Sequence, residues 1–383
     1  MSMLSVNEFG QLVLVHLFQS QNYTGNIALS GQSFYIMLSI ITAGVGERTR
    51  HKLSRLLHHD VHKLYSEKSW KGTEVGTILS QMSEVIKSTM TTKSAIFHSF
   101  SIRPRFMNGS KQLTDIEYHR CDLLSTEKVT NKINRWVLKN TEPTINGLYQ
   151  DELENDTNMI LITIMHFYSE WLVPFDPMKT KTETFTNNEG KELYVSMMNQ
   201  MESYKIHTDY HNNFSIIIIP MKQNGMYATI LLPDRGCQIQ QTVRSFRWDY
   251  IPNYFHNAPT YDVELKIPKF KITTHNHFVN TLIDLNASEI FDPEKADLIL
   301  TTRKNAAIKD LLQLTAVVVN EFGTWYPNIH EQKNFFKTKP ESRSAKRPNR
   351  YQFFLDRPFL FLIYSSYSSK VVLSVIVNQP NYY

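Results

Sequence analysis

The sequence predicts an α+β protein, because helical patterns dominate its first part and strand patterns dominate the rest. Beyond residue 159, β-branched and aromatic side chains gather in short runs that are typical of strands. In residues 261–267 polar and apolar side chains alternate strictly, which is the pattern of a strand with one face in water. With 383 residues, 42% of them apolar, the chain can bury a full core, which excludes a disordered or collagen-like protein.

Helices are expected mainly before residue 159. Ser5 and Glu8 fit a capping box, and apolar residues follow them at helical spacing, so a first helix should begin there. The same spacing recurs at residues 33–43, 49–57 and 127–138; glycines end the first of these stretches, and Pro143 and Gly147 follow the last. The first part of the chain is therefore predicted to be mostly helical.

Strands are expected at residues 159–165, 214–219, 226–232, 261–267, 315–319, 359–364 and 371–377. The runs 216–219 and 317–319 lack alternation, which is typical of strands that are covered on both faces. No repeat, low-complexity tract or linker divides the chain. We therefore expect one large domain over residues 1–383.

The positive charge of the chain is confined to one segment. Residues 337–350 carry six basic residues and one acidic residue, and this difference equals the whole formal net charge of +5. A protein that binds nucleic acid or a membrane surface usually spreads Lys and Arg over a face or a helix. We therefore expect neither partner, and interpret the segment as an exposed basic loop.

The cysteines and the N-terminus predict a reducing compartment. Cys121 and Cys237 lie far apart and fit no metal-ligand spacing, so they are expected to be free thiols. The first residues lack the basic region of a secretion signal, and no run of about 18 apolar residues could cross a membrane. These features predict a cytoplasmic protein.

No motif indicates an enzyme, a metal or a cofactor. Four histidines gather near one predicted helix end, and two of them are one helical turn apart: His51, His58, His59 and His62. A metal site is one interpretation, but no third ligand at a suitable spacing accompanies them, so a solvated polar face is the favoured interpretation. Neither cysteine has a histidine partner that would make it a nucleophile, and no nucleophile elbow or phosphate-binding loop occurs.

The segment from residue 315 to residue 380 carries the functional signal. A buried strand is followed by Asn320-Glu321-Phe322-Gly323-Thr324, then by a long polar and basic loop, and then by two apolar strands. A long loop without apolar periodicity inside a compact domain is usually functional or disordered. Its Lys and Arg residues would be open to trypsin-like proteases.

These residues resemble those of a known family. The segment 320–324 is similar to the proximal hinge of serpins, and residues 357–361 resemble the strand after their reactive loop. Other segments follow in the order of the family between about residues 5 and 380, namely NIALS at 26–30, WLVPF at 171–175, VSMM at 195–198, LLPD at 231–234, IPKF at 267–270 and ADL at 296–298. The amino-acid sequences of several segments most resemble those of the intracellular poxvirus serpins.

The resemblance implies a single α+β domain of three β-sheets and about nine helices, with an exposed reactive-centre loop at about residues 321–357. In inhibitory serpins a target protease cleaves this loop, becomes acylated and is distorted as the loop inserts into the large sheet. It further implies a monomer without a cofactor that is active in a host cell, either in the cytoplasm or after release. Its partner would be a host protease, in particular a trypsin-like one, or another host protein.

The hinge departs from the family pattern after Glu321, Gly323 and Thr324. The family has small residues next, whereas this chain has Trp325, Tyr326 and Pro327. If Thr324 pointed inward in an inserted strand, the period of two would also bury Tyr326, Asn328 and His330, and overpacking costs about 1–3 kcal/mol per site. Pro327 removes a ladder donor from the middle of the sheet. Suicide trapping of a protease is therefore in question.

The latch region of the large sheet differs as well. Ser30 and Ser33 agree with the family, but Thr163 and Gln313 stand where Asn and His are usual.

Several bonds are candidates for the bait, the bond that a target protease attacks. Counting from Gly323 points to Lys337-Thr338, and counting back from Pro358 points near Arg347. Proline follows Arg347, which leaves Arg343-Ser344 and Arg350-Tyr351 as alternatives. The basic residues would equally serve to keep an exposed loop soluble. Two hypotheses remain: an inhibitor with a basic bait, and a serpin-fold protein that binds a host protein or an acidic partner.

Overall fold

The computed structural model describes residues 5–57, 59, 61–66, 69–121, 126–141, 148–149, 159–324 and 350–381. By their contacts the residues form two compact units that alternate along the chain. The first unit comprises Met1–Val13, Ser30–His166 and Thr274–Thr315, and the second comprises Leu14–Leu29, Phe167–Thr273 and Ala316–Tyr383.

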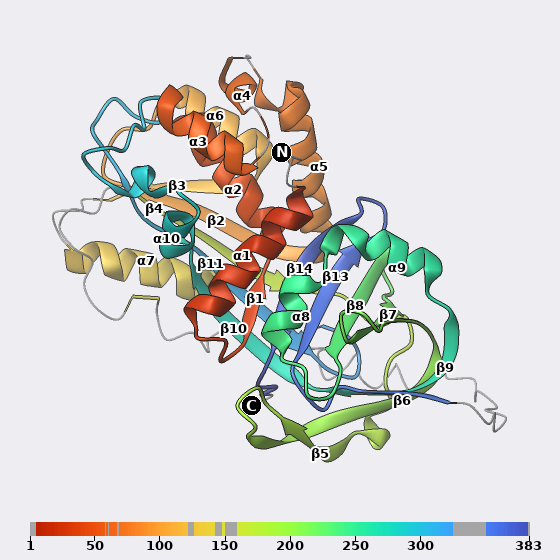
Figure 1. The fold of residues 1–383 in the computed structure, drawn as a ribbon. Helices are drawn as coiled ribbons and strands as arrows, with labels where there is room; N and C mark the ends of the chain where they lie inside the picture. The colour runs from red at the N-terminus through yellow and green to blue at the C-terminus, as the bar shows by residue number, and fades with distance from the viewer. Residues whose placement is uncertain are drawn as a thin grey trace. The chain divides into compact units, whose positions relative to one another are not determined.

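Helices and strands are both abundant, as expected for an α+β protein. The described residues contain ten α-helices against about nine expected: α1 (Val6–Ser20), α2 (Gly31–Gly44), α3 (Glu47–Leu57), α4 (His62–Ser66), α5 (Glu74–Thr89), α6 (Pro104–Leu113), α7 (Thr126–Asn140), α8 (Ile239–Ser245), α9 (Ile251–Asn257) and α10 (Val279–Asp284). Most of them precede β4, which fits the predicted order (Figure 1). No helix of the described residues is long and apolar enough to cross a membrane.

The first unit contains most of a five-stranded sheet. Its order is β10 (Phe270–His277), β11 (Ile308–Val319), β4 (Met159–Phe167), β2 (Met90–His98) and β3 (Ile116–Arg120), so β11 and β4 are direct neighbours. Helix α7 packs on one face of this sheet, where its Ile133 and Trp136 meet alternate residues of the strands, such as Ile162 and Leu314 (Figure 1). Alternation then places Thr163 and Gln313 on the opposite face.

Most of the remaining strands belong to the second unit. One path runs in the order β1 (Ile27–Leu29), β14 (Lys370–Val377), β13 (Phe359–Ser365), β8 (Met226–Pro233), β7 (Phe214–Pro220), β6 (Glu192–Asp209), β9 (Thr260–Pro268) and β12 (Tyr351–Phe354), with β5 (Lys181–Thr186) also paired to β6. Strand β6 pairs with β9 over residues 197–205 and with β7 over residues 205–209. It is therefore shared by two sheets, which with the five-stranded sheet gives the three expected.

The local predictions have clear outcomes. Ser5 and Glu8 form the predicted reciprocal capping box, with the Ser5 N–H donating to Glu8 at 2.8 Å and the Glu8 N–H donating to Ser5 at 3.1 Å. Each predicted strand lies in an observed one, and residues 216–219 are all buried as expected. The predicted helical character of the first part was incomplete, because β2 and β3 lie within it. Helices α5 and α6 were not predicted.

Candidate functional site: the hinge of the reactive loop

Strand β11 ends in a tight turn over residues 320–323. The Asn320 N–H donates to the Gly323 carbonyl at 2.8 Å, and the Gly323 N–H donates back to the Asn320 carbonyl at 3.2 Å. The Phe322 N–H also donates to the Asn320 side chain at 2.9 Å, which closes the turn from inside. The chain therefore reverses its direction at the point where the strand ends.

Gly323 is required in this turn for two reasons. Its φ of +147° lies in a region that residues with a side chain rarely adopt. A Cβ atom there would also lie 2.2 Å from the Ser169 carbonyl oxygen and 2.6 Å from the Glu170 Cα, both of which are backbone atoms. The glycine of the predicted hinge is thus fixed by backbone geometry and by close approach together.

Thr324 attaches the start of the loop to the chain that follows β4. Its N–H donates to the Ser169 carbonyl at 2.7 Å, and its hydroxyl accepts the Ser169 N–H at 2.8 Å. The Thr324 side chain is only 1% exposed. Because Ser169 lies two residues after β4, and β4 is the neighbour of β11, the loop begins on the β4 side of β11. A strand that extended from Thr324 would therefore run antiparallel to β11, between β11 and β4.

The segment 171–175 lies against the turn, and its contacts with the turn explain why these residue types occur in the segment. The Trp171 N–H donates to the Phe322 carbonyl at 3.0 Å, and its indole N–H donates to the Asn320 carbonyl at 2.8 Å. The Phe175 N–H donates to the Glu321 carbonyl at 2.8 Å. Three hydrogen-bond acceptors of the turn are therefore satisfied by one segment, in which both aromatic rings are buried.

Glu321 forms a buried ion pair below the turn. Its residue is 5% exposed, and its carboxylate lies 3.0 Å from the Lys269 ammonium, which comes from the link between β9 and β10. The Thr180 hydroxyl donates a second hydrogen bond to the carboxylate at 2.8 Å. A buried charge is tolerated only when it is paired and hydrogen-bonded, and both conditions are met here.

Three of the four predicted latch residues meet. Ser30 caps α2 by accepting the Ser33 N–H at 3.3 Å. The Ser30 N–H donates to the Gln313 side-chain oxygen at 2.8 Å, and the Gln313 amide nitrogen donates back to the Ser30 carbonyl at 3.2 Å. Thr315 donates to the same Gln313 oxygen at 3.1 Å. Gln313 thus joins the start of α2 to β11.

Thr163, the fourth latch residue, has a different partner. Its hydroxyl lies 3.2 Å from the Ser94 hydroxyl on β2, and within the described residues no side-chain hydrogen bond joins Thr163 to Gln313. The predicted latch is therefore two separate contacts. One contact lies on the β11 side of the boundary between β11 and β4, and the other lies on the β4 side.

Arg350 marks the far end of the loop. It is exposed, and Tyr351 directly after it begins β12, where it pairs in parallel with Val263 of β9. The remaining candidates lie outside the described residues, namely the hinge residues Trp325, Tyr326 and Pro327 and the bait residues Lys337, Thr338, Arg343, Ser344 and Arg347.

One polar cluster of the first unit was missed by sequence reasoning. The Asp310 carboxylate on β11 accepts a hydrogen bond from the Tyr149 hydroxyl at 2.8 Å and lies 2.9 Å from the His277 ring nitrogen on β10. This hydrogen bond to Asp310 raises the pKa of His277 above its ordinary value. Burial and the same carboxylate raise the pKa of Tyr149. These residues are distant in the sequence, so no local spacing could have revealed the cluster.

The His277–Asp310 pair should make stability depend on pH. Because the folded-state pKa of His277 is raised, its contribution is fully present below the unfolded value of about 6.5 and is lost as the pH rises through the folded value. The contribution of His275 to stability should depend on pH in the opposite direction, because burial lowers its pKa. We expect His277→Gln to destabilise the protein more at about pH 5.5 than at about pH 8.5, measured by urea unfolding. Equal loss at both pH values would contradict this assignment.

The histidines and the cysteines are the two other groups that the sequence singled out. Among the described residues no group of His, Cys, Asp or Glu could hold a metal ion, and His58 lies outside them. Both cysteines are free thiols, and burial raises the pKa of Cys121, which makes it a weaker nucleophile near neutral pH.

Comparison with known proteins identifies the family to which the chain belongs. The family model described as serpin (serine protease inhibitor) matches residues 4–380. The chain belongs to the serpin family. An uncharacterized serpin-like protein of Methanosarcina acetivorans is 25% identical over 366 residues, which cover 94% of this chain and 83% of that protein. Serpin A12 of Mus musculus is 25% identical over 98% of this chain and 87% of its own.

A solved serpin structure agrees in fold. Human thyroxine-binding globulin aligns with a TM-score of 0.82 at 22% identity, over 99% of both chains. The three-sheet α+β architecture is therefore the serpin fold, as predicted. The two relatives come from an archaeon and a mouse, so the finer resemblance to poxvirus serpins stays a prediction.

Proposed function

We propose that the protein is a serpin-type inhibitor-like protein that presents a basic bait loop to trypsin-like serine proteases. The observation that carries this proposal is the hinge, in which Gly323 reverses the chain and Thr324 is bonded to Ser169 on the β4 side of β11. A cleaved loop that starts there is directed toward insertion between β11 and β4. The two separate latch contacts support insertion between β11 and β4, because Thr163 bonds to Ser94 and Gln313 bonds to Ser30, and no side-chain hydrogen bond from Thr163 to Gln313 would have to break.

The next residues oppose insertion. Tyr326 would have to fit beneath the sheet on the same side as Thr324, and Pro327 cannot donate to a neighbouring strand. The overpacked ring of Tyr326 and the missing donor at Pro327 would each cost about 1–3 kcal/mol. We propose that insertion is therefore slow, so that most encounters with a protease end in a cut loop and few end in a covalent complex.

The position of β12 bears on the choice of bait. A protease needs several extended residues on both sides of the bond that it attacks, and the Arg350-Tyr351 bond leads directly into a paired strand. We therefore propose the bait at Lys337-Thr338 or Arg343-Ser344, with Lys337-Thr338 first because it has the family's spacing from Gly323, whereas Arg347 is followed by proline.

A trypsin titration tests the proposed function. Incubated with increasing trypsin, the chain should be cut in the loop, with a minor fraction of the protease in a complex that survives SDS. The midpoint of thermal unfolding should rise by less than about 10 °C after cutting, because insertion is incomplete. A chain whose loop resists trypsin would overturn the proposed bait, and stoichiometric complex formation would overturn the proposed slow insertion.

A second function is favoured by the sequence 325–327. If the loop never inserts, the protein would act by binding, with residues 337–350 as a basic contact for an acidic partner. In that case trypsin would form no SDS-stable complex at any ratio, and cutting would leave the thermal midpoint unchanged.

The setting of this activity is also a proposal. Two observations support a role in the cytoplasm of a host cell: the sequence resemblance to intracellular poxvirus serpins, and the free thiols Cys121 and Cys237. There the protein would modulate a host protease or another host protein. Release from the cell would be compatible with the same loop. Fractionation of infected or transfected cells would separate the two locations.

A further inference from the structure

A cavity of about 690 Å³ lies in the first unit, on elements separate from the hinge. It is lined by α4, by the segment that leads into α6 and by the segment before β11, through Tyr65, Ser101, Ile102, Arg103, Pro104, Arg105, Leu300, Thr302, Arg303 and Lys304. Its volume falls within the range of about 300–1,000 Å³ that is typical of small-molecule sites. Ile102, Leu300 and Pro104 give it an apolar wall.

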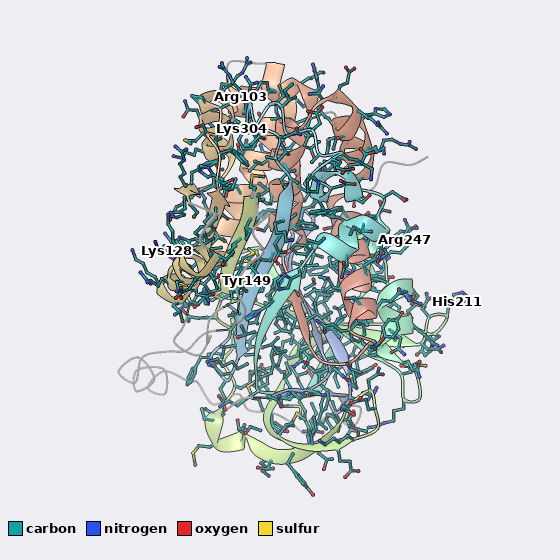
Figure 2. All side chains as sticks on the ribbon, turned by 90° about the vertical axis from the view of Figure 1, so that its left-hand side faces the viewer. Arg103, Lys128, Tyr149, His211, Arg247 and Lys304 are labelled. Atoms are coloured by element: carbon teal, nitrogen blue, oxygen red, sulfur yellow. The ribbon has the colours of Figure 1, made fainter. Side chains whose placement is uncertain are left out.

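The charges of the described residues that line this cavity all have one sign. Arg103, Arg105, Arg303 and Lys304 are cationic, and none of the described lining residues carries a carboxylate. Figure 2 shows Arg103 and Lys304 near each other in the first unit, and both line the cavity. Arg303 and Lys304 are exposed, and neither takes part in an ion pair within the described residues. The cationic groups of this pair are therefore available to an anion.

The backbone that carries these cations is held in place. The Arg103 N–H donates to the Thr301 carbonyl at 2.8 Å, and Ile102 pairs with Thr302 as an antiparallel bridge. The Tyr65 hydroxyl donates to the Leu300 carbonyl at 3.1 Å. The three segments that line the cavity are thus bonded to one another, which reduces the entropy lost when a ligand orders them.

Two side chains already have defined orientations. The Arg105 guanidinium carbon lies over the Tyr65 ring, 4.8 Å from its centre, a cation–π contact between two residues that line the cavity. The Arg103 Nε–H donates to the Thr302 carbonyl at 3.5 Å, which ties Arg103 to the segment that carries Arg303 and Lys304. Arginine donates in a planar fork that matches the oxygens of phosphate and sulfate.

Helix α6 adds to the positive potential. Arg103 is its N-cap residue, and no side chain caps this end of the ten-residue helix. A helix N-terminus favours negative charge, so its dipole has the same sign as the four side chains.

We propose that this cavity binds a small anionic ligand that carries two or more phosphate or sulfate groups. The four cations supply the charge, the exposed side chains of Arg303 and Lys304 supply donors, and the volume fits a small molecule rather than a protein segment. This site is independent of the reactive loop. It therefore stands or fails separately from the proposed protease binding.

Calorimetric titration tests the site with inositol hexakisphosphate and sucrose octasulfate, and with inositol and sucrose as uncharged controls. The double variant Arg303→Gln/Lys304→Gln should weaken binding of the anions by about tenfold or more, because two charge-assisted contacts are lost. The matched variant Lys128→Gln/Lys139→Gln removes the same charge from exposed positions of α7, which do not line the cavity, and should change binding by less than about threefold. Unfolding temperatures of both variants confirm that they fold.

The outcomes separate the alternatives. Binding of inositol hexakisphosphate alone would identify phosphate as the ligand group, and binding of sucrose octasulfate alone would identify sulfate. Equal weakening by the two double variants would show a response to overall charge and would overturn the proposed site. Absence of binding by both anions at about 0.1 M salt would overturn it as well.

Discussion

The variant Tyr326→Ala/Pro327→Ala should turn a loop that is mostly cut by trypsin into one that mostly captures it. In an inserted strand the change removes the overpacked ring and restores the missing N–H donor, and each term is about 1–3 kcal/mol. We expect the SDS-stable fraction of trypsin to rise by about tenfold. After cutting, the thermal midpoint of the variant should exceed that of the cut wild-type chain by on the order of 10 °C.

The control for this variant is Trp325→Ala. It also removes a large aromatic ring beside Thr324, but the period of two turns this position away from the side of Tyr326. We expect it to change the SDS-stable fraction much less than the double variant does. If both variants behave alike, the inserted register that begins at Thr324 is wrong.

Loss of the ion pair below the hinge should destabilise the protein strongly. Lys269→Met leaves the Glu321 carboxylate, in a residue only 5% exposed, without its cation, and breaking a buried pair in this way costs about 3–5 kcal/mol. Urea unfolding of the uncut protein measures the change. We expect the midpoint of unfolding to fall with little change in its slope.

Two further variants test the cause of that loss. Lys222→Met removes the cation of a more exposed pair with Glu170, which lies beside Gly323, and should cost less than about 1 kcal/mol. Glu321→Leu/Lys269→Met removes both charges and should recover much of the stability lost in the single variant. A double variant no more stable than Lys269→Met would show that the unpaired Glu321 charge does not cause the loss.

The fold was predictable from the sequence to the extent that its elements follow local patterns. The capping box at Ser5, the strands after residue 159 and the ordered family segments all depend on near neighbours in the chain, and all are confirmed. Strands β2 and β3 were not predicted, since β2 has the mixed sequence MTTKSAIFH and is continuously buried only from Ser94 to His98. Its place in the five-stranded sheet is set by distant partners, which no single window contains.

The site was predictable only in part, for the same reason. Gly323 and Thr324 could be singled out because the hinge sequence is local, and the structure places Gly323 in the turn after β11 and bonds Thr324 to Ser169; their role as a hinge stays a prediction. The partners Ser169 and Lys269 could not be identified, because folding brings them to the turn from other strands. The resemblance grouped Thr163 with Gln313 in the latch region, which stays a prediction; the contact of the Thr163 hydroxyl with Ser94 on β2 could not be foreseen, because it depends on the order of the strands.

The central position of β13 and β14 determines what a protease leaves behind. Both strands follow the loop in sequence, yet they lie between β8 and β1 within their sheet, and their residues are almost entirely buried. A chain nicked anywhere between residues 325 and 349 would therefore be two polypeptides in one particle. The smaller piece would remain bound, because its strands β13 and β14 lie between strands of the larger piece in one sheet, and only denaturant would release it. In the absence of denaturant, proteolysis of this protein would be invisible to size-exclusion chromatography.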